Sequence, residues 1–579
     1  MDETRDQVTG QGNKKAWDLR EFFRSESGLR AGQLLVGVLA IGLVFWFLQF
    51  STRSICCGDY DGYYHIKWSR LLWEGIRSKH FPPAFTWLPL TTLNPNSYVD
   101  HHLLFHIFQM PFTWFGDLRM GAKISAMVFA IVAVFSCYWL IVHYRINYAL
   151  VWLIALLACS APFLYRMNMA KAPPFAIIYL VLGIYLLWER KHVLLIPLAF
   201  VFALTYDMFV LLGLAVLIWV AVIGWTESRF EWRPLLYVLA GSLAGLIINP
   251  YFPHNLYLLY EHVLIKVTAV DFTTKVGQEW YPYDTREFMA LCFVALAAML
   301  AGYIAFDGSD RKRSARQLFL LIFSTALMIM TMRWKRFAEY WPPFAVIFAA
   351  FTLQPVFMGA RSALGHLPSD VLDELGPFLD RHEPTPMARA SQRRELWRTI
   401  KAGAVAVALG IALLINVSLT AKDIGKSAER DYYQKGMAWV RTNVPPGQMI
   451  FNTDWDDFPR LFYYDPTHVY VTGLDPSYLL DKNPDLARLY ERITLGEEKD
   501  PGPLIRDRFG ARYVFSDNTN DHDEFYANAM ESGWFDRVYE DEDCTILFVR
   551  DQKGAPPAET QPDEPDLEPD EPVDPEKGP

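Results

Sequence analysis

A carboxylate follows the first long apolar segment of the chain. Asp61 lies shortly after the apolar run 31–50, in the sequence CGDYDGYYH, with the basic Lys67 and Arg70 behind it. A carboxylate at the mouth of a membrane cavity can hold a divalent cation or take up a proton. We therefore consider Asp61 a candidate catalytic base and metal ligand. The alternative is an ordinary solvated acid of a loop.

More side chains suited to a metal stand at the far end of the same polar segment. The sequence there reads Asp100-His101-His102. Carboxylate and imidazole together form a suitable ligand set for Mn²⁺ or another transition metal. Asp100 and His102 are therefore candidate ligands beside Asp61. Asp100 could instead cap the next helix, and the histidines could lie at the membrane interface.

Glu279 is a second candidate acid. It lies in the sequence VGQEWYP at 276–282, between an apolar stem and a turn of proline and aromatic residues. A mobile loop of this kind can bring a carboxylate over a cavity. We consider Glu279 a candidate catalytic residue and metal ligand, with a solvated loop acid as the alternative.

A basic cluster, RWKRFAEYWPP at 333–343, stands at the outer end of an apolar run. Arginine pairs bidentately with phosphate, which a lipid-linked substrate presents at headgroup depth. Arg336 and Lys335 are therefore candidate substrate-binding residues. Arg166 and Asp207, at the ends of other runs, could line the same cavity. The alternative for Arg336 is an arginine that extends to the membrane surface without a ligand.

The elements that must position these residues are membrane helices. The chain has 579 residues, 52% of them hydrophobic and 15% aromatic. A membrane-spanning helix needs roughly 17–25 mostly apolar residues, and about eleven runs approach this length. They are centred in 31–50, 122–142, 148–164, 173–188, 193–204, 208–225, 235–248, 289–306, 318–332, 341–356 and 402–419. The sequence therefore predicts a polytopic α-helical membrane protein with about eleven spans.

Lysine and arginine in the short loops predict the orientation of these helices. Positively charged loops favour the cytoplasmic side. If the segment 1–30 is cytoplasmic, most of the basic loops, including 357–401, fall on that side as well. The loops 51–118 and 249–286 and the whole chain after 421 are then extracytoplasmic. We expect an integral multi-pass protein, in the inner (plasma) membrane if the source is bacterial.

The polar remainder of the chain is expected to form a separate domain. Between 422 and 552, helical patterns alternate with short β-type runs at 448–451, 468–472, 513–515 and 544–549, which predicts an extracytoplasmic α/β domain. The segment 31–421 forms the transmembrane domain. The tail 553–579 is acidic and rich in proline, which predicts disorder. The net charge is −10, and we expect no nucleic-acid partner.

Taken in chain order, these positions resemble the GT-C superfamily of polyprenyl-lipid-dependent glycosyltransferases, most of all the catalytic subunit of oligosaccharyltransferase. Asp61 and the residues after it resemble that family's first acidic metal motif. Glu279 is similar to the external-loop glutamate that contacts metal and acceptor. Arg336 resembles the arginine near the lipid pyrophosphate. The sequence DWDDF at 454–458, with Trp455 and Asp456, lies where the family's acceptor-recognition motif begins the soluble domain.

The chain departs from the family pattern in two places. Where a second acidic metal motif is expected, the sequence reads YRMNMAKAP at 165–173, and Lys171 would repel a cation there. Asp100 and His102 could then supply the missing ligands, or the chain does not use that metal geometry. The motif around Trp455 also lacks the family's second Trp, its Tyr and its Gly. We therefore do not carry asparagine over as the acceptor.

The resemblance implies a membrane glycosyltransferase that moves a sugar or oligosaccharide from a polyprenyl-phosphate or pyrophosphate donor to an acceptor outside the membrane. The acceptor would be a protein, a glycan or a lipid. Asp61 and Glu279 would be catalytic, while Arg336, Arg166, Lys335, Trp455 and Asp456 would bind substrate. A divalent cation, Mn²⁺ or Mg²⁺, would be held by Asp61, Asp100, His102 and Glu279. The alternatives are a transporter or flippase of lipid-linked saccharides and an inactive scaffold subunit of the same fold.

Overall fold

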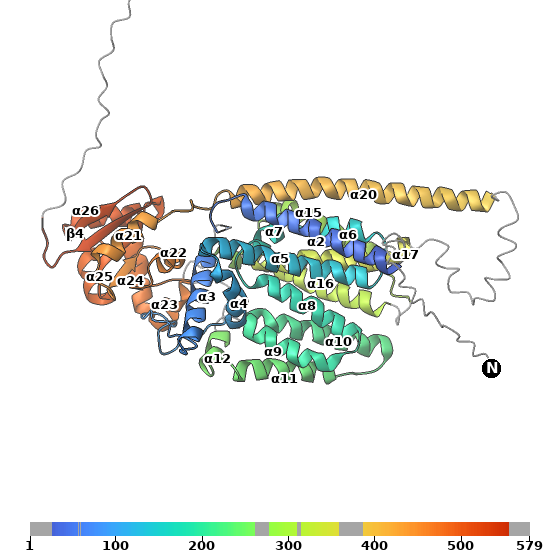
Figure 1. Cartoon of the computed structure of the whole chain (residues 1–579), viewed down its shortest axis with the longest axis horizontal. Coiled ribbons are helices and arrows are strands. Elements are labelled where there is room, and N and C mark those ends of the chain that lie inside the picture. Colours follow the sequence, from blue (N-terminus) through green and yellow to red (C-terminus); the bar gives the residue numbers. More distant parts are fainter. Residues whose placement is uncertain are drawn as a thin grey trace, which may run out of the picture. The chain divides into compact units, whose positions relative to one another are not determined.

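The structure is a computed structural model that describes residues 26–55, 57, 60–260, 277–309, 314–357 and 386–554 (Figure 1). The chain divides into two compact units. Unit 1 comprises Met1–Phe85 and Pro95–Arg430, and unit 2 comprises Thr86–Asn94 and Asp431–Pro579. Of the expected terminal segments, residues 1–25 and the tail from 555 onward lie outside the described residues, as does 358–385 of the expected cytoplasmic loop.

Unit 1 is helical. Its α-helices are α2 (Glu26–Phe50), α3 (Asp61–Arg77), α4 (Leu103–Gln109), α5 (Leu118–His143), α6 (Ala149–Leu157), α7 (Ala161–Met167), α8 (Pro173–Trp188), α9 (Leu195–Thr205), α10 (Val210–Glu227), α11 (Arg233–Ile247), α12 (His254–Leu259), α14 (Thr285–Leu291), α15 (Phe293–Ala305), α16 (Ala315–Arg333), α17 (Trp341–Phe357) and α20 (Pro386–Ile424). Short 3₁₀ turns at η1 (Met110–Trp114), η2 (His192–Leu194), η3 (Asp207–Phe209), η5 (Gln278–Trp280) and η6 (Lys335–Glu339) join several of them.

Fewer helices are long enough to cross a membrane than the expected eleven. In the described part of the chain, five helices meet the requirement of length and apolarity, or seven if each of two sharply bent pairs forms one span. The bent pairs are α6 with α7, at 79°, and α14 with α15, at 81°. Three further apolar helices are shorter, among them α8 with 16 residues. At about 1.5 Å per residue, α8 does not reach across a hydrocarbon core of about 30 Å.

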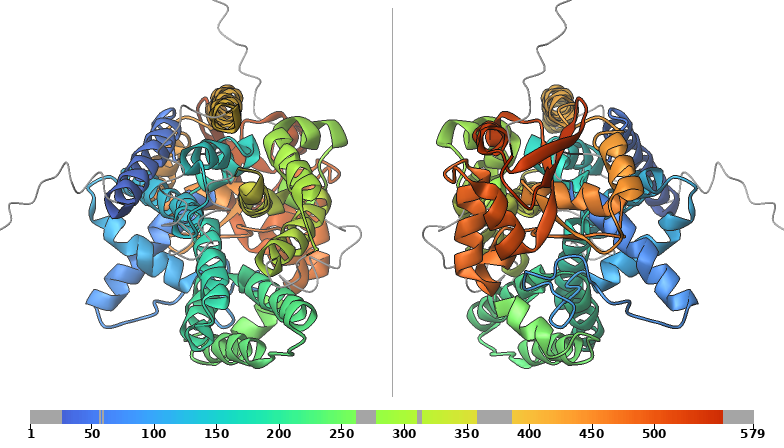
Figure 2. Two further views of the ribbon diagram at one scale, coloured as in Figure 1. Left: turned by 90° about the vertical axis from the view of Figure 1, so that its right-hand side faces the viewer. Right: turned by 90° about the vertical axis from the view of Figure 1, so that its left-hand side faces the viewer.

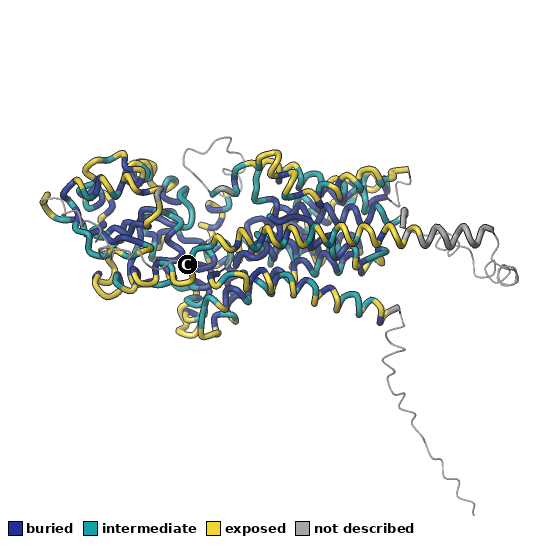
Figure 3. Tube along the Cα trace, turned by 90° about the horizontal axis from the view of Figure 1, so that it is seen from above, coloured by how far each residue is buried: buried dark blue, intermediate teal, exposed yellow. Residues whose placement is uncertain are grey.

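The core of unit 1 is largely apolar. Helix α5 packs against α2 and α8, α9 packs against α11, and α15 packs against α17 (Figure 2). Buried residues fill the interior of the bundle that these helices form (Figure 3). The apolar window of α20 differs, because only 6% of it is buried. Its exposed side chains, such as Leu414 at 69%, suit a helix that faces lipid.

Unit 2 contains a five-stranded sheet in the order β2-β1-β3-β5-β4. The strands are β1 (Met449–Asn452), β2 (Val469–Tyr470), β3 (Ala511–Asp517), β4 (Phe535–Glu540) and β5 (Cys544–Val549). β1 pairs parallel with β2 and β3, whereas β5 pairs antiparallel with β3 and β4. The helices are α21 (Gln434–Asn443), α22 (Phe458–Tyr464), α23 (Ser477–Lys482), α24 (Pro484–Thr494), α25 (Pro501–Phe509) and α26 (Asp523–Ser532).

The limits of the two units differ from the expected division at 422. Helix α20 continues to Ile424, and unit 2 begins only at Asp431. Unit 2 also takes in Thr86–Asn94 from the long first loop. Within that segment, the Trp87 indole N–H donates to the carbonyl of Pro466 at 2.7 Å, and the Tyr470 amide donates to the carbonyl of Trp87 at 2.8 Å.

Candidate functional site

The segment from the end of α7 to the start of α8 carries two basic side chains, Arg166 and Lys171. Ser160 caps the start of α7 by accepting from the Phe163 amide, and Pro162 occupies the first turn, where it costs no hydrogen bond. Arg166 lies in the last turn of this seven-residue helix. The Gln49 side-chain amide then donates to the Asn168 carbonyl at 2.6 Å, which fixes the chain just before Lys171.

Arg336 comes from the short turn η6, at the end of α16. The Lys335 amide donates to the Tyr281 carbonyl at 3.1 Å, so the backbone of η6 is tied to the loop that carries Glu279. This hydrogen bond holds η6, which carries Arg336, next to the loop that carries Glu279. Lys335 itself points elsewhere, since its ammonium lies 3.4 Å from the exposed Glu287 and over the ring of Tyr283.

Arg166, Arg336, Glu279 and Glu339 form one arginine–carboxylate cluster. Glu279 bridges the two arginines, accepting from Arg166 at 2.6 Å and from Arg336 at 2.8 Å. Arg166 also donates to Glu339, which is fully buried. Arg336 donates to the Tyr206 hydroxyl at 2.8 Å. Three residues predicted to be functional from the sequence, namely Arg166, Glu279 and Arg336, are thus in contact.

The electrostatics of the cluster favour the charged forms. Burial disfavours a charged Glu279, but the Arg336 and Arg166 guanidinium groups outweigh this and hold the pKa of that carboxyl well below its usual range. The Arg336 guanidinium also lies 5.1 Å from the centre of the Trp280 ring. Its buried Nε has no hydrogen-bond partner in the described part of the chain, and neither has Glu339 Oε2. The Arg336 donor is directly suited to an anionic ligand.

Two residues of this site were not predicted from the sequence: Glu339, which belongs to the cluster, and Tyr206, which accepts from Arg336. Tyr206 follows α9 at a helix break, next to the singled-out Asp207. Glu339 lies three residues after Arg336 in the basic cluster. A signal for Glu339 existed, because an arginine buried beside a membrane needs a carboxylate partner and this acid is the nearest in sequence.

Asp61 is the first residue of α3 and pairs with Lys171, with 2.8 Å between Oδ2 and Nζ. Gly62 permits this approach. A Cβ on Gly62 would come within 2.8 Å of Ile55 Cγ2 and 3.2 Å of Ala170 Cβ, which is closer than side chains ordinarily pack. The absence of a side chain at 62 therefore brings the start of α3 against the residue that precedes Lys171.

Asp100 lies in a different, buried hydrogen-bond network. Its carboxylate accepts from the Trp68 indole at 3.0 Å, from His106 Nδ1 at 2.8 Å and from the His102 amide at 3.0 Å. His106 Nε2 in turn lies 2.8 Å from His65 Nδ1. Burial raises the pKa of Asp100, but His106 and the hydrogen bonds outweigh it and lower that pKa overall. We call these four side chains (Trp68, Asp100, His106 and His65) the Asp100 network.

The His102 ring stacks on Tyr206, with 5.4 Å between ring centres. Burial, together with the neighbouring histidines and Arg336, holds the pKa of His102 well below its usual value, so the ring is neutral. His102 therefore borders the arginine–carboxylate cluster through Tyr206, whereas Asp100 is held in its network.

The expected metal ligands are not gathered into one site. Asp61 pairs with Lys171, Glu279 bridges two arginines and Asp100 lies in its network. Among the described residues, no group of three or more His, Cys, Asp or Glu side chains has a metal-binding arrangement. The residues around Asp61 therefore do not fit a divalent cation.

Trp455 and Asp456 lie in unit 2, in η7 (Trp455–Asp457). Asp454 caps this turn by accepting from the Asp456 amide at 2.9 Å, and Asp457 accepts from the buried Tyr433 hydroxyl at 2.7 Å. Burial and the neighbouring Asp517 raise the pKa of Asp457 well above its usual value. The role of Trp455 and Asp456 in substrate binding remains a prediction.

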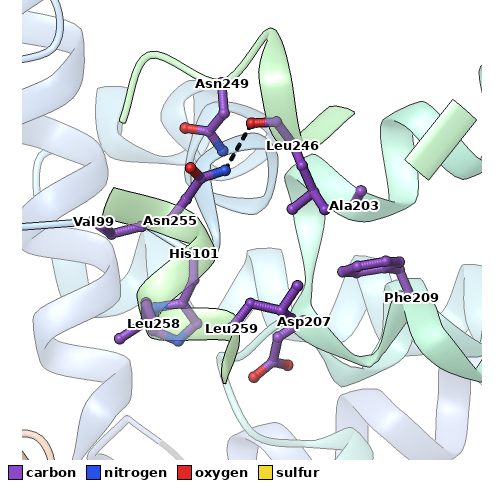
Figure 4. Close-up of a pocket in the computed structure, with 10 residues that line it drawn as sticks. All are labelled: Val99, His101, Ala203, Asp207, Phe209, Leu246, Asn249, Asn255, Leu258 and Leu259. Carbon is purple, nitrogen blue, oxygen red and sulfur yellow. Dashed lines mark hydrogen bonds between the residues drawn. The ribbon is translucent and has the colours of Figure 1, made fainter. Parts of the chain in front are cut away.

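A small pocket, with a cavity volume of about 30 Å³, is lined in part by Asp207 and His101 (Figure 4). Its lining combines polar side chains with aliphatic ones and one aromatic ring, from Val99, His101, Ala203, Asp207, Phe209, Leu246, Asn249, Asn255, Leu258 and Leu259. His101 and Asp207 directly neighbour His102 and Tyr206 in sequence. Asn255 donates to the Leu246 carbonyl at 2.8 Å, which holds α12 against the end of α11.

Comparison with solved structures shows that the fold is similar to that of several membrane glycosyltransferases. The oligosaccharyltransferase of Archaeoglobus fulgidus is 12% identical with a TM-score of 0.57, and the match covers 87% of this chain and 73% of that one. ArnT from Cupriavidus metallidurans, determined with undecaprenyl phosphate bound, is 14% identical with a TM-score of 0.52, covering 89% and 97%. The arabinofuranosyltransferase AftD from Mycobacteria is 13% identical with a TM-score of 0.50, covering 90% and 40%.

All three are membrane glycosyltransferases of the GT-C superfamily. The chain has the GT-C fold. The resemblance expected from the sequence is therefore confirmed at the level of the fold, and the apolar helices of this GT-C chain agree with a multi-pass membrane protein. No protein-family model matches the sequence, and no curated protein matches it either. The archaeal oligosaccharyltransferase has also been determined with zinc and sulfate and with a tethered acceptor peptide.

Proposed function

We propose that this GT-C protein is a glycosyltransferase that moves a sugar or oligosaccharide from a polyprenyl-phosphate or pyrophosphate donor to a protein, glycan or lipid acceptor. The observation that carries the proposal is the pair of largely shielded arginines, Arg336 and Arg166, held together by Glu279. Two guanidinium groups spaced to share one carboxylate are also spaced to share one phosphate. The buried Arg336 Nε adds a donor that no described residue uses.

The donor would bind with its phosphate at Arg336 and Arg166. As the bond from the anomeric carbon to the phosphate oxygen breaks, negative charge develops on that oxygen, and preorganised guanidinium donors stabilise it. Glu279, which already lies on both arginines, would move aside or share them when the phosphate arrives. In support of this donor class, undecaprenyl phosphate is bound in one structure of ArnT, a protein with the same fold.

The side chains around the pocket in Figure 4 would contact the sugar of the donor, and this cavity of about 30 Å³ would have to widen when the sugar binds. Its polar members, including His101, Asp207 and Asn249, suit hydroxyl groups, and Phe209 offers an aromatic face. Asp207 follows Tyr206, which accepts from Arg336, and His101 precedes His102, which stacks on Tyr206. A phosphate at Arg336 would therefore place the attached sugar toward this pocket.

The acceptor would attack the anomeric carbon while its proton passes to a carboxylate. Asp61 is our candidate for that base, and Glu279 would close over the reacting groups. The oxygen or nitrogen of the acceptor forms the new bond, and the phosphate leaves on the lipid. Trp455 and Asp456 would contribute to acceptor binding. No step in this proposal uses a divalent cation, because the described residues do not fit one.

The proposed reaction takes place on the extracytoplasmic face of the membrane, which follows from the basic loops. A reporter fused beside Asp500 would then be extracytoplasmic, and one inserted within 362–385 would be cytoplasmic. A cytoplasmic readout beside Asp500 would contradict the orientation.

Two other functions suit the same fold less well. A lipid-linked saccharide transporter typically holds its charges near the midplane, at broken helices in corresponding halves. Here Glu279 and Arg336 lie in short turns between helices. An inactive scaffold would not need a buried, partnerless guanidinium donor.

Arg336→Lys tests the proposal. Lysine keeps the charge but loses the paired donors. Loss of a charge-assisted hydrogen bond of about 1.5–3 kcal/mol should weaken apparent donor affinity roughly ten- to a hundredfold. The measurement is sugar transfer against donor concentration in one lipid mixture. Arg333→Lys is the matched control, because Arg333 is exposed one turn away on α16. Identical donor curves for Arg336→Lys and wild type would overturn the assignment of the phosphate to Arg336.

A further inference from the structure

We infer that Lys171 is the resident cation of this site, and that its ammonium on Asp61 replaces a divalent metal ion. The inference rests on the proposed function. It also makes a claim about metal binding that can be judged without any activity. The motif that the family would fill with a second acid carries Lys171 here, and the structure places that lysine directly on the first acid.

The contact is built by the packing of the chain. Gly62 allows the first turn of α3 to approach Ala170, which sets Asp61 opposite the next residue, Lys171. Both side chains are largely shielded, with 16% of Lys171 and 24% of Asp61 exposed. Asp61 also begins a helix, where a negative charge interacts favourably with the backbone amides. The carboxylate therefore has two stabilising partners before any ligand binds.

A divalent cation would compete directly with this ammonium. Metal–oxygen distances for Mg²⁺ and Zn²⁺ are about 2.0–2.2 Å. A cation that close to Asp61 Oδ2 would stand within a few ångströms of Lys171 Nζ, which is only 2.8 Å from the same oxygen. The two positive charges would repel each other in a shielded site. Nearby carboxylates do not relieve this conflict, because Glu279 is held by two arginines and Asp100 by its network.

Lys171 also acts on the rest of the site. Burial raises the pKa of Glu279, whereas Arg336 and Arg166 lower it, and the charge of Lys171 lowers it further. Lys171 therefore interacts electrostatically with both candidate catalytic acids, Asp61 and Glu279. A metal ion at this place would serve the same purpose: it would hold Asp61 in position and add positive charge near the donor phosphate. Lys171 is thus a positioning residue for Asp61.

The first experiment measures metal binding by the purified full-length protein. Mn²⁺ is titrated in as MnCl₂ and the free ion is followed by electron paramagnetic resonance. Wild type is expected to bind no Mn²⁺ at submillimolar concentrations. Lys171→Asp, which removes the ammonium and adds a carboxylate beside Asp61, is expected to bind one. Lys79→Asp makes the same charge change at an exposed position of the first loop and is expected to bind none. Stoichiometric binding of Mn²⁺ by wild type would overturn the inference.

The second experiment uses sugar transfer, with EDTA present throughout. Wild type is expected to keep full activity, Lys171→Arg to keep most of it, and Lys171→Gln to lose at least tenfold in kcat, with an unchanged melting temperature. Loss of wild-type activity in EDTA, restored by Mn²⁺, would overturn the inference, as would full activity in Lys171→Gln. If wild type transfers no sugar from any lipid-linked donor, the proposed function fails, while the Mn²⁺ titration still decides the role of Lys171.

Discussion

The arginine–carboxylate cluster and the Asp100 network use similar chemistry for different ends. Both contain buried carboxylates that accept two or more hydrogen bonds, and both join segments distant in sequence. In the Asp100 network, the groups that donate to Asp100 come from α3 or from the first loop. In the cluster, Arg336 retains a buried donor with no described partner. A satisfied network stabilises the fold, whereas an incompletely satisfied one is suited to a ligand.

The largest effect separating the two regions is expected for Asp100→Ala. This change leaves the Trp68 indole, His106 and the His102 amide without their acceptor in a site where Asp100 and His106 are each about 1% exposed. Breaking such a buried pair costs about 3–5 kcal/mol. We expect a marked fall in the melting temperature, measured in detergent, with His80→Ala as an exposed control from the same loop. If Asp100→Ala melted at the same temperature as wild type, the Asp100 network would not stabilise the fold.

Glu279→Gln should have a smaller effect on stability, and one that depends on pH. The folded-state pKa of Glu279 is depressed, so its stabilising contribution is present above the unfolded value of about 4.3 and is lost as pH falls toward the depressed value. At pH 7, glutamine should cost about 1.5–3 kcal/mol. Melting temperatures of wild type and Glu279→Gln should differ at pH 7, and this difference should shrink below pH 4.

The control for that measurement is Glu287→Gln. Glu287 pairs with Lys335 at 3.4 Å, and its side chain is 42% exposed, so its removal should change the melt little at either pH. A gap between wild type and Glu279→Gln that is the same at both pH values would show that Glu279 does not titrate as its two arginines imply.

The smallest effects are expected when a single hydrogen-bonding group is removed, a hydroxyl beside the cluster or an indole N–H in the Asp100 network. Tyr206→Phe removes the hydroxyl that accepts from Arg336. It should weaken the affinity for the lipid-linked sugar donor about three- to tenfold and leave the melting temperature near that of wild type. Trp68→Phe removes a donor to Asp100 and should lower the melting temperature without changing donor affinity. If both variants affected the same property, the two regions would not differ in the way the structure indicates.

Residue type and chain order were enough to predict the charged part of the site. Arg166 and Arg336 follow the ends of apolar runs, and Glu279 lies in the loop 249–286 between two runs. A buried charge there needs a partner, and the structure joins the three. The hydrogen-bond partners of Asp100, by contrast, could not be predicted from residue type and chain order. Its partners, Trp68 and His106, are set by how α3 packs against the first loop, and no local spacing in the sequence encodes that packing.

Strand prediction in the polar segment found four of the five strands. The predicted runs 448–451, 468–472, 513–515 and 544–549 correspond to β1, β2, β3 and β5. β4 was missed because its sequence, FDRVYE, buries only Phe535 fully and leaves the other five residues partly exposed or exposed. An edge strand of this kind carries little apolar alternation. The count of about eleven spans is not confirmed by the described residues, because apolar composition alone does not show that helices such as α8 are short or that others bend.

The segment Thr86–Asn94 makes the smaller unit discontinuous in sequence. Leu90 packs against the apolar core of that unit, and Trp87 bonds to the backbone on both sides of the loop that leads into β2. The polypeptide consequently enters or leaves this unit after Phe85, after Asn94 and after Arg430. A fragment that starts at 431 would lack part of its own fold and expose the surface that Leu90 covers. Exchange of this unit between proteins of the same fold would therefore require two separate stretches of gene to be inherited together.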